Sequence, residues 1–291
     1  MENVQIPELL TTTPLYQRIS LENPGGQVAI RDVIMYSGTF DSFCPGCAMT
    51  ATFNGSVTSD WQRASDAQRA SLSAVSRVGT QTVNPFAISN FVKTVRCTRD
   101  KKHFVTSYFQ VSSDRTYFQK VGQYQSVADI LKGETSELAS ELGRDLAREF
   151  NMAITASAHG VGIGAHIYLR RIFESLVEDA HTRAKAADAW DEAAYERARM
   201  AEKVSMLRAE LPAFLAEHPQ LYSVLSVHLH ALSEEEARQN FERLKQAILI
   251  IAEQKREVKK AAEREKAARR ALGELVKEVA PASGAAKHVR D

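Results

Sequence analysis

Residues 158–180 read AHGVGIGAHIYLRRIFESLVEDA, a glycine-rich turn followed by an apolar pattern. The three glycines close one helical pattern and open the next, because glycine permits a tight turn between closely packed helices. The apolar residues that follow recur at a spacing of three to four: Leu169, Ile172, Phe173 and Leu176. This spacing places them on one side of a helix, so we expect a central helix over residues 164–186 that buries this side.

Helical patterns also flank the central helix. Before it, apolar residues repeat every four positions: Leu138, Leu142, Leu146, Phe150 and Ile154. They predict one long amphipathic helix over residues 135–158. After it, a third pattern covers residues 193–211 and stops at Pro212, and His218-Pro219 can start a fourth helix, since proline suits the first helical turn.

The last helix is predicted to be the longest. Ser233-x-x-Glu236 forms a capping box, the usual signal for a helix start. An apolar stripe follows: Phe241, Leu244, Ile248 and Ile251. Beyond Glu253 charged residues dominate and the stripe thins: Val258, Leu272, Leu275 and Val279. We therefore expect residues 253–291 to hold an extended helix followed by a disordered tail. The helix is either a coiled-coil arm or a solvated rod, and Pro281 ends it.

The N-terminal part of the chain has a different character. Residues 1–32 are polar and rich in proline and glycine, and we expect a loosely packed arm. Residues 33–122 contain a Ser-, Ala- and Gln-rich insert and short runs in which apolar and polar residues alternate, a pattern typical of strands. These runs flank residues 44–47 and recur at residues 91–96 and 103–111. The sequence therefore predicts an α+β protein, a small β-rich module followed by helices.

The boundary between the two parts falls near residues 122–133. Ser126-x-x-Asp129 resembles a capping box and predicts a short helix that Gly133 can close. We therefore expect the helical domain to cover residues 123–252.

Composition excludes several classes of protein. The chain has 291 residues, enough for about two domains at the usual ~100–200 residues each. Its net charge is +1, but residues 61–120 hold ten Lys and Arg against three Asp, an excess that suggests an anionic partner or a basic solvated face. No hydrophobic run approaches the ~20 residues of a membrane span, and the N-terminus lacks a basic-then-apolar signal, so we expect a cytoplasmic protein.

All three cysteines of the chain fall into one metal-ligand pattern. Cys44-Pro-Gly-Cys47 offers two thiolates from one tight turn, and Cys97 lies with His103 in a second turn between two predicted strands. Zinc prefers four such ligands in a tetrahedron. We predict a zinc ribbon in which one structural zinc ion has these four ligands: Cys44, Cys47, Cys97 and His103. Asp100 is an alternative fourth ligand, and a cytosolic redox pair is the alternative role.

Three phrases carry a resemblance: KVGQY at residues 120–124, GIGAHIYLRRIFE at residues 162–174 and HLHALSEEE at residues 228–236. The chain resembles a family of uncharacterised bacterial proteins that join a cysteine-rich N-terminal module to a helical domain of unknown function. That helical domain is similar to the HEPN superfamily (higher eukaryotes and prokaryotes nucleotide-binding). The resemblance covers residues 43–253. It implies an up-and-down helical bundle, often dimeric, of the kind found in toxins, RNA-cutting enzymes and phage-defence systems of bacteria.

The sequence departs from the active members of that superfamily. Active HEPN ribonucleases carry an arginine and a histidine with four to six residues between them on the same helix, so that both can reach one phosphate. No arginine of the helical domain precedes a histidine at that spacing, and Arg96 and His103, which do match it, lie in the predicted zinc turn. The known ribonuclease signature is therefore absent.

A composite site is the remaining candidate for catalysis. Arg170, Arg171 and Glu174 on the central helix can face His230 on a neighbouring helix of an up-and-down bundle. Two guanidiniums bind phosphate through paired hydrogen bonds, and an imidazole can move a proton near neutral pH. The alternative is that Arg170 and Glu174, four residues apart, form an ion pair that braces the bundle.

The leading hypothesis is an RNA-binding or RNA-processing protein of a bacterial defence or stress system. The alternative is a non-catalytic scaffold that dimerises through its helical domain and docks a partner through the zinc ribbon. The first predicts a cleft where Arg170 or Arg171 meets a histidine, and the second predicts that those arginines are paired. The glycine run at residues 160–164 differs from a dinucleotide-binding fingerprint and follows a helix, so it indicates a tight turn between helices.

Overall fold

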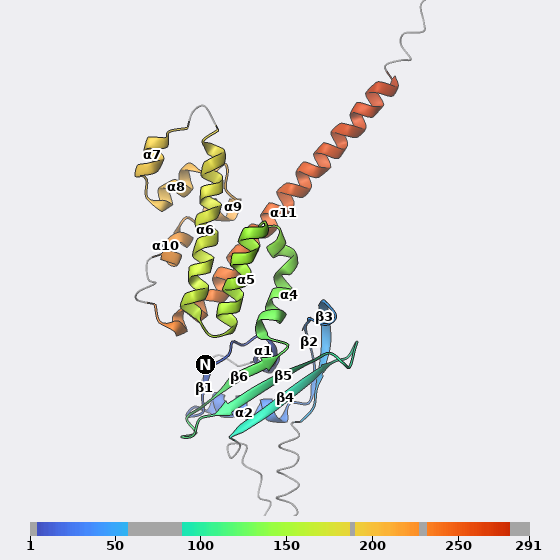
Figure 1. Ribbon diagram of the computed structural model, residues 1–291, viewed down its shortest axis with the longest axis vertical. Helices are drawn as coiled ribbons and strands as arrows, with labels where there is room; N and C mark the ends of the chain where they lie inside the picture. The colour runs from blue at the N-terminus through green and yellow to red at the C-terminus, as the bar shows by residue number, and fades with distance from the viewer. Residues whose placement is uncertain (1–4, 58–88, 187–189, 227–231, 280–291) are drawn as a thin grey trace, which may run out of the picture.

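The cysteine-bearing segments form one antiparallel sheet in the computed structural model, which describes residues 5–57, 89–186, 190–226 and 232–279. Within these residues six strands follow the order β1-β6-β5-β4-β3-β2 (Figure 1). The strands are β1 (Arg18–Ser20), β2 (Gly38–Cys44), β3 (Met49–Gly55), β4 (Asn90–Cys97), β5 (Phe104–Val111) and β6 (Tyr117–Tyr124). Buried and exposed residues alternate along β4, which identifies one covered and one open side of the sheet.

The predicted strands around the two cysteine turns are confirmed. β2 pairs with β3 up to Cys44 and Met49, and β4 pairs with β5 up to Arg96 and Phe104. The sequence analysis did not identify β1 and β6 as strands. In β6 the alternation is masked because Lys120, an apparent surface residue, is buried.

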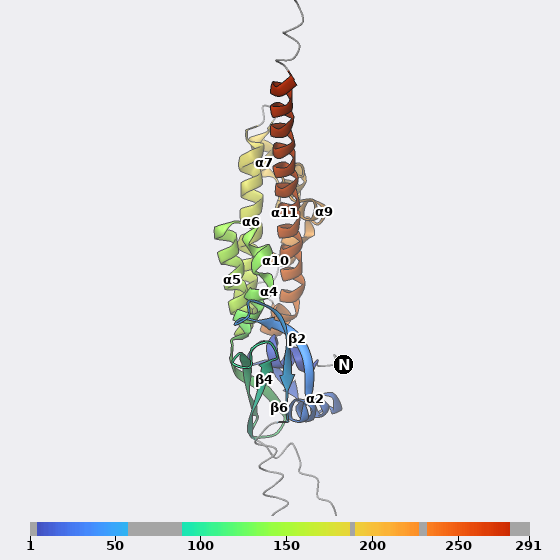
Figure 2. The same cartoon turned by 90° about the vertical axis from the view of Figure 1, so that its right-hand side faces the viewer.

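Residues 6–35 are better ordered than the expected loosely packed arm. They form α1 (Ile6–Thr11) and α2 (Pro24–Met35), which cover one side of the sheet and contribute several buried residues: Leu9, Leu10, Ile30, Val33 and Ile34 (Figure 2). Proline is compatible with these helices because it occupies their first turns, and Asn23 caps α2 by accepting a hydrogen bond from the Gly26 N–H at 2.9 Å.

A buried lysine fixes the end of α2 to the sheet. The Lys93 ammonium, on β4, donates to the carbonyl oxygens of Tyr36 at 2.7 Å and Ser56 at 2.6 Å. Burial lowers the pKa of Lys93 to about 8, and the carbonyl oxygens replace the water that the ammonium has lost. This residue therefore belongs to the core of the module and is unavailable to an external anion.

The second half of the chain is helical. Its helices are α4 (Val127–Ser140), α5 (Arg144–Ala158), α6 (Gly162–Ala184), α7 (Glu192–Arg197), α8 (Met200–Met206), α9 (Ala213–Glu217), α10 (Gln220–Ser226) and α11 (Glu234–Val279). The predicted central helix is confirmed as α6, and the helix expected after Pro219 is α10. The predicted tail after residue 279 and His230 lie outside the described residues.

Three predicted helices are wrong in their extent. The single helix expected over residues 135–158 is two helices, because Gly143 adopts φ +91° and starts α5 in a new direction. Gly133 does not end the short helix that Ser126 caps, since α4 continues to Ser140. The pattern over residues 193–211 likewise divides into α7 and α8, with Ala198 in an extended conformation between them.

The glycine-rich turn joins α5, α6 and α11 at close range. Gly160 adopts φ +77°, and a Cβ at Gly162 would lie 2.9 Å from the Arg238 backbone nitrogen of α11. Glu234 of α11 caps α6, accepting hydrogen bonds from the backbone N–H of Gly162 at 2.6 Å and of Ile163 at 3.2 Å. The predicted tight turn between helices is therefore confirmed, and its glycines serve packing.

Two hydrophobic cores meet at α4. Ile130 lies in the core of the sheet, whereas Val127 and Leu131 lie in the core of the bundle. Gly133 brings α4 against β2, because a Cβ there would lie 1.9 Å from Cε1 of Phe43. The absence of a side chain at this position lets the helix approach the sheet closely.

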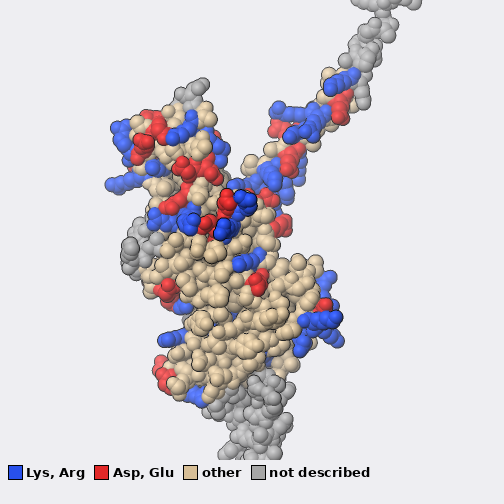
Figure 3. Space-filling view, in the orientation of Figure 1, with Lys and Arg blue, Asp and Glu red and all other residues tan. Residues whose placement is uncertain are grey.

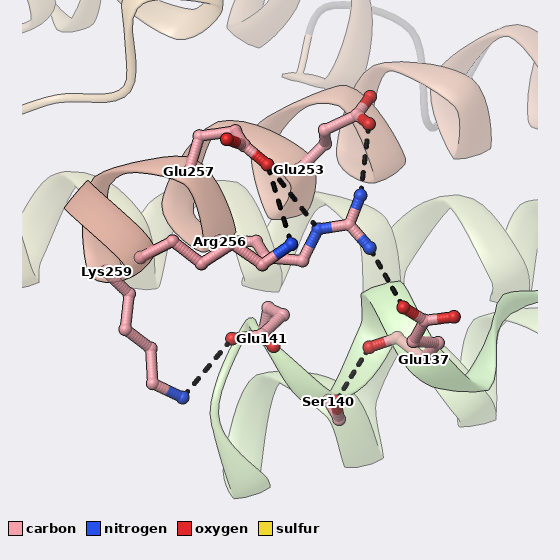
Figure 4. Close-up of polar contacts among 8 residues, drawn as sticks. Glu137, Ser140, Glu141, Glu253, Arg256, Glu257 and Lys259 are labelled. Carbon is pink, nitrogen blue, oxygen red and sulfur yellow. Dashed lines mark hydrogen bonds and ion pairs between the residues drawn. The ribbon is translucent and has the colours of Figure 1, made fainter. Parts of the chain in front are cut away.

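α11 starts at the predicted capping box, in which the Ser233 hydroxyl and the Glu236 carboxylate accept from each other's backbone N–H. Near the end of the bundle, Arg256 binds Glu137 of α4 at 3.0 Å, and Lys259 binds Glu141 at 3.5 Å (Figure 4). Beyond these pairs the helix leaves the body, and residues 257–277 are all exposed (Figure 1). None of the described helices has the length and apolar character needed to cross a membrane.

We predict opposite effects for two glycine substitutions in helices. Gly133→Ala should lower the free energy of unfolding by about 1–3 kcal/mol, because the new methyl group collides with the Phe43 ring. Gly273→Ala should raise the helicity and leave the fold intact, because no atom lies within 4 Å of a Cβ there and alanine favours helix by about 1 kcal/mol. Denaturant unfolding followed by circular dichroism measures both, and equal effects would contradict the close contact.

Candidate metal centre

Four metal-ligating side chains converge at one end of the sheet. Their ligand atoms all lie within 4.8 Å of one another: Cys44, Cys47, Cys97 and His103. The Cys47 sulfur is 3.8 Å from the Cys97 sulfur and 3.3 Å from Nδ1 of His103, and the Cys44 sulfur is 3.7 Å from the same Nδ1. The structure thus brings together the four residues that the sequence predicts as metal ligands.

These separations fit a tetrahedral ion. With metal–sulfur bonds of about 2.3 Å and a metal–nitrogen bond of about 2.0–2.1 Å, the sulfurs of a tetrahedral site lie ~3.8 Å apart, and sulfur and nitrogen lie ~3.5 Å apart. The sulfur–sulfur separation of 3.8 Å and the sulfur–nitrogen separations of 3.3 and 3.7 Å match these values. The three cysteines form no disulfide. The arrangement can therefore hold a metal ion.

The first turn is shaped to present two thiols. The Cys47 N–H donates to the Cys44 carbonyl at 3.1 Å, and Ala48 at φ +52° turns the chain into β3. Gly46 lies against the fourth ligand, His103, because a Cβ there would be 2.6 Å from Cδ2 of the imidazole. The glycine between the two cysteines thus makes room for the imidazole that comes from the other hairpin.

The second turn orients that imidazole. The backbone N–H of His103 donates to the Asp100 carbonyl at 2.9 Å, and the Cys97 N–H donates to the His103 carbonyl at 2.9 Å. The Asp100 carboxylate lies 3.7 Å from Nε2 of His103, on the far side of the ring from the thiols. Asp100 is therefore placed to orient the imidazole, as carboxylates do around metal-binding histidines, and the alternative in which it is the fourth ligand is not favoured.

Crowding of the thiols changes their acidity. Burial, together with hydrogen bonds to Cys44 and Cys97, raises the pKa of Cys47 to about 11. Burial alone would also raise the pKa of Cys97, but the backbone N–H groups of Asp100 and Arg99 donate to its sulfur and lower that pKa. A cation among the three sulfurs would favour the thiolates, because its charge offsets their mutual repulsion.

The site is closed. Cys44 and Cys97 are buried, and Cys47 and His103 are half-buried. Four protein ligands complete a tetrahedron, whereas a catalytic metal keeps one position for water or substrate. The ligands come from two hairpins, β2–β3 and β4–β5. An ion here would cross-link those hairpins.

The proposed catalytic residues are held in two separate groups. Arg170 binds Glu174 at 2.8 Å and donates to the Tyr222 hydroxyl of α10 at 3.2 Å. Arg171 instead binds Glu149 of α5 at 2.9 Å. The two guanidiniums thus reach different neighbouring helices and are paired with carboxylates. The fourth member of that prediction, His230, lies outside the described residues.

A polar cluster that the sequence analysis missed lies at the far end of α6. His181 contacts Glu192 at 3.0 Å and stacks on Tyr195 at 3.8 Å, while Lys185 binds Glu192 at 2.6 Å and the Trp190 indole donates to it at 2.8 Å. The hydrogen bond from Lys185, followed by that from His181, lowers the pKa of Glu192 to about 2. No regular spacing links these residues, since they meet only because α7 folds back on α6. The cluster braces that turn.

Comparisons of the chain with protein-family models, with curated proteins and with solved structures give no match. The function must therefore be inferred from the geometry of the described residues.

We predict that Gly46→Ala weakens metal binding. The added methyl group would collide with the His103 ring and displace a ligand, so affinity for Co²⁺ should fall by about tenfold or more. Thiolate-to-Co²⁺ absorption, titrated against a chelator, measures this affinity. Gly25→Ala is the control, because Gly25 lies in α2 and the nearest atom to its Cβ is Oδ1 of Asn23, at 3.4 Å. Equal affinity of the two variants would contradict the described contact.

Proposed function

We propose that the protein is a non-catalytic scaffold, with a zinc-stabilised sheet that docks a partner and a C-terminal helix through which two copies associate. The observation that carries this proposal is α11. It is fixed to the body by Arg256 and Lys259, and it then extends with residues 257–277 exposed. A helix that is anchored at one end and unpartnered at the other suits association with another chain.

The free part of α11 carries a weak coiled-coil seam. At heptad spacing five of six positions between residues 258 and 275 are apolar: Val258, Ala261, Ala268, Leu272 and Leu275. Leu272 is 61% exposed and Leu275 is 56% exposed within the single chain. Pairing with a second copy would remove these side chains from water, which favours association.

The arginines of α6 support the non-catalytic assignment. Arg170 and Arg171 are each neutralised by a carboxylate, and they bind different neighbours. A phosphate would have to displace Glu174 and Glu149 before both guanidiniums could reach it. The arrangement favours the alternative role, in which Arg170 and Glu174 form an ion pair that braces the bundle.

Zinc is the metal that the donor set favours. Three thiols and one imidazole in a closed tetrahedron are typical of structural zinc sites. Such a site contributes folding free energy of order 10 kcal/mol, because the unfolded chain does not hold the ligands together. The ion would therefore stabilise the docking module.

We predict one zinc ion per chain. Elemental analysis of the purified protein should show it, and Cys97→Ser should abolish it. Removal of the ion should unfold the sheet before the bundle, because the two have separate cores. Near- and far-ultraviolet circular dichroism with increasing chelator would follow the two steps. Absence of metal, or another metal at full occupancy, would contradict the assignment.

We predict that Leu272→Glu combined with Leu275→Glu converts a dimer to a monomer. The two carboxylates would repel their counterparts across the seam. Light scattering over a range of concentrations measures the mass. The matched control, Ala267→Glu with Gly273→Glu, adds the same charge away from the seam and should leave the dimer intact. A protein of monomeric mass in all forms would contradict self-association through α11.

RNA binding is a second candidate function, and the HEPN resemblance suggested it together with a role in bacterial defence. A specific observation favours the binding part: the open side of the sheet carries tyrosines beside a group of cations. RNA processing and the defence role rest on the resemblance alone.

A further inference from the structure

One side of the sheet is open to solvent among the described residues. α1, α2 and the end of α4 all pack on the other side, where the buried residues of the strands lie. The open side faces the viewer in Figure 1, and α2 lies behind the strands. Figure 3 shows this side as a broad surface of uncharged residues, with a group of mainly Lys and Arg at its right-hand end and a few residues of both charges at the opposite edge. Such a surface is accessible to a partner.

Aromatic rings form a row across this side. Tyr108 is 45% exposed and Tyr124 is 55% exposed, so each presents a large part of its ring to solvent. Tyr108 lies against Gly122 of β6, where a Cβ on the glycine would be 3.6 Å from the tyrosine ring. Tyr124 packs on Phe104 with ring centroids 5.3 Å apart. The strands therefore hold these rings in place while leaving part of each tyrosine uncovered.

Cations lie at the metal-binding end of the same row. Arg96 pairs across the strands with Phe104, and its guanidinium lies 5.5 Å from the centre of that ring. Beside it is a hollow of about 330 Å³, whose described lining contains two cations, Arg96 and Lys101, and no carboxylate. Arg99 and Lys102 are also exposed in this turn. The aromatic row thus leads into a basic hollow.

Most residues around the rings are polar, and Val92 is the apolar neighbour of Tyr108 on β4. The hydroxyls of Thr94 and Thr106 contact each other at 2.9 Å, and Gln119 donates to Gln110 at 3.4 Å. A protein partner that buried this side would meet separated rings and amides instead of a continuous apolar patch. Bases can stack on separate rings, and the phosphates between them can follow the cations.

We infer that the open side of the sheet binds single-stranded nucleic acid, with bases stacked on Tyr108 and Tyr124 and phosphate contacts at Arg96 and Lys101. Stacking tolerates every base, so the site reads little sequence. A duplex keeps its bases paired and cannot present them to the tyrosines. The inference gives RNA binding, the second candidate function, a surface; it does not depend on self-association through α11.

The test is a titration of short, fluorescein-labelled single strands followed by anisotropy. The full-length, metal-loaded protein is titrated into RNA, into DNA of the same sequence and into the RNA duplex. We expect the single strands to bind and the duplex to bind at least tenfold more weakly. Similar binding of RNA and DNA would support stacking and charge as the shared basis, whereas a preference for RNA would add a contact to the ribose hydroxyl.

Variants separate stacking from charge. Tyr108→Ala and Tyr124→Ala should each weaken binding by about tenfold, whereas Tyr108→Phe and Tyr124→Phe keep the rings and should bind like the natural protein. Arg96→Gln with Lys101→Gln should reduce the salt dependence between about 50 and 200 mM by roughly 0.7 in slope for each lost phosphate contact. Arg208→Gln, an exposed cation of the helical part, is the charge control.

Three results would overturn the inference. One is no binding of any single strand at about 50 mM salt, which would leave this side to a protein partner. Another is equal binding of the tyrosine-to-alanine variants and the natural protein. The third is a duplex that binds as tightly as the single strands. Metal content and the unfolding midpoint of every variant must match the natural protein, and the mass of the α11 variants tests self-association separately.

Discussion

The cluster of three thiols and one imidazole spans a weakly paired part of the sheet. The β2–β3 and β4–β5 hairpins each pair at seven positions, but β3 and β4 pair at only three, from Phe53 to Gly55. Residues 56–89 connect these two strands, and closing so long a connection costs entropy. An ion held by both hairpins would offset part of that cost. The position of one half of the sheet relative to the other therefore depends on the metal ligands.

The sheet in turn positions the bundle through α4. Ile130 lies in one core and Leu131 in the other, so a single helix contributes to both. Gly133 sets the approach of this helix to Phe43 of β2, the strand that ends at Cys44. At the opposite end of α4, Glu137 and Glu141 bind Arg256 and Lys259, where α11 leaves the bundle. The direction of the projecting helix is thus fixed by contacts that continue through α4 to the hairpin that carries Cys44 and Cys47.

Sequence patterns predicted the structural features that depend on residues close together in the chain. The C-x-x-C turn, the second turn at Cys97 and the Ser233 capping box could be identified because spacing alone defines them. The break at Gly143 could not, because the apolar repeat continues through it, and its backbone conformation depends on how α4 and α5 pack. Glu192 meets His181 and Lys185 only because α7 packs against α6. The fold class and the Arg170–Glu174 pair, four residues apart on one helix, were therefore predictable, whereas polar contacts between different helices, such as that of His181 with Glu192, were not.

Which cations can meet an anion also depends on the tertiary structure. The basic excess of residues 61–120 includes Lys93 and Lys120, yet both are buried and unavailable to an anion. The cations that are exposed near the metal ligands are Arg96, Arg99, Lys101 and Lys102. A divalent ion with three thiolates carries a net charge of about −1, so these four cations exceed it. The remaining positive charge can attract the phosphates of a nucleic acid. The turn that carries Cys97 and His103 would therefore also supply the charge for nucleic acid, so that metal binding and nucleic-acid binding would share one segment of the chain.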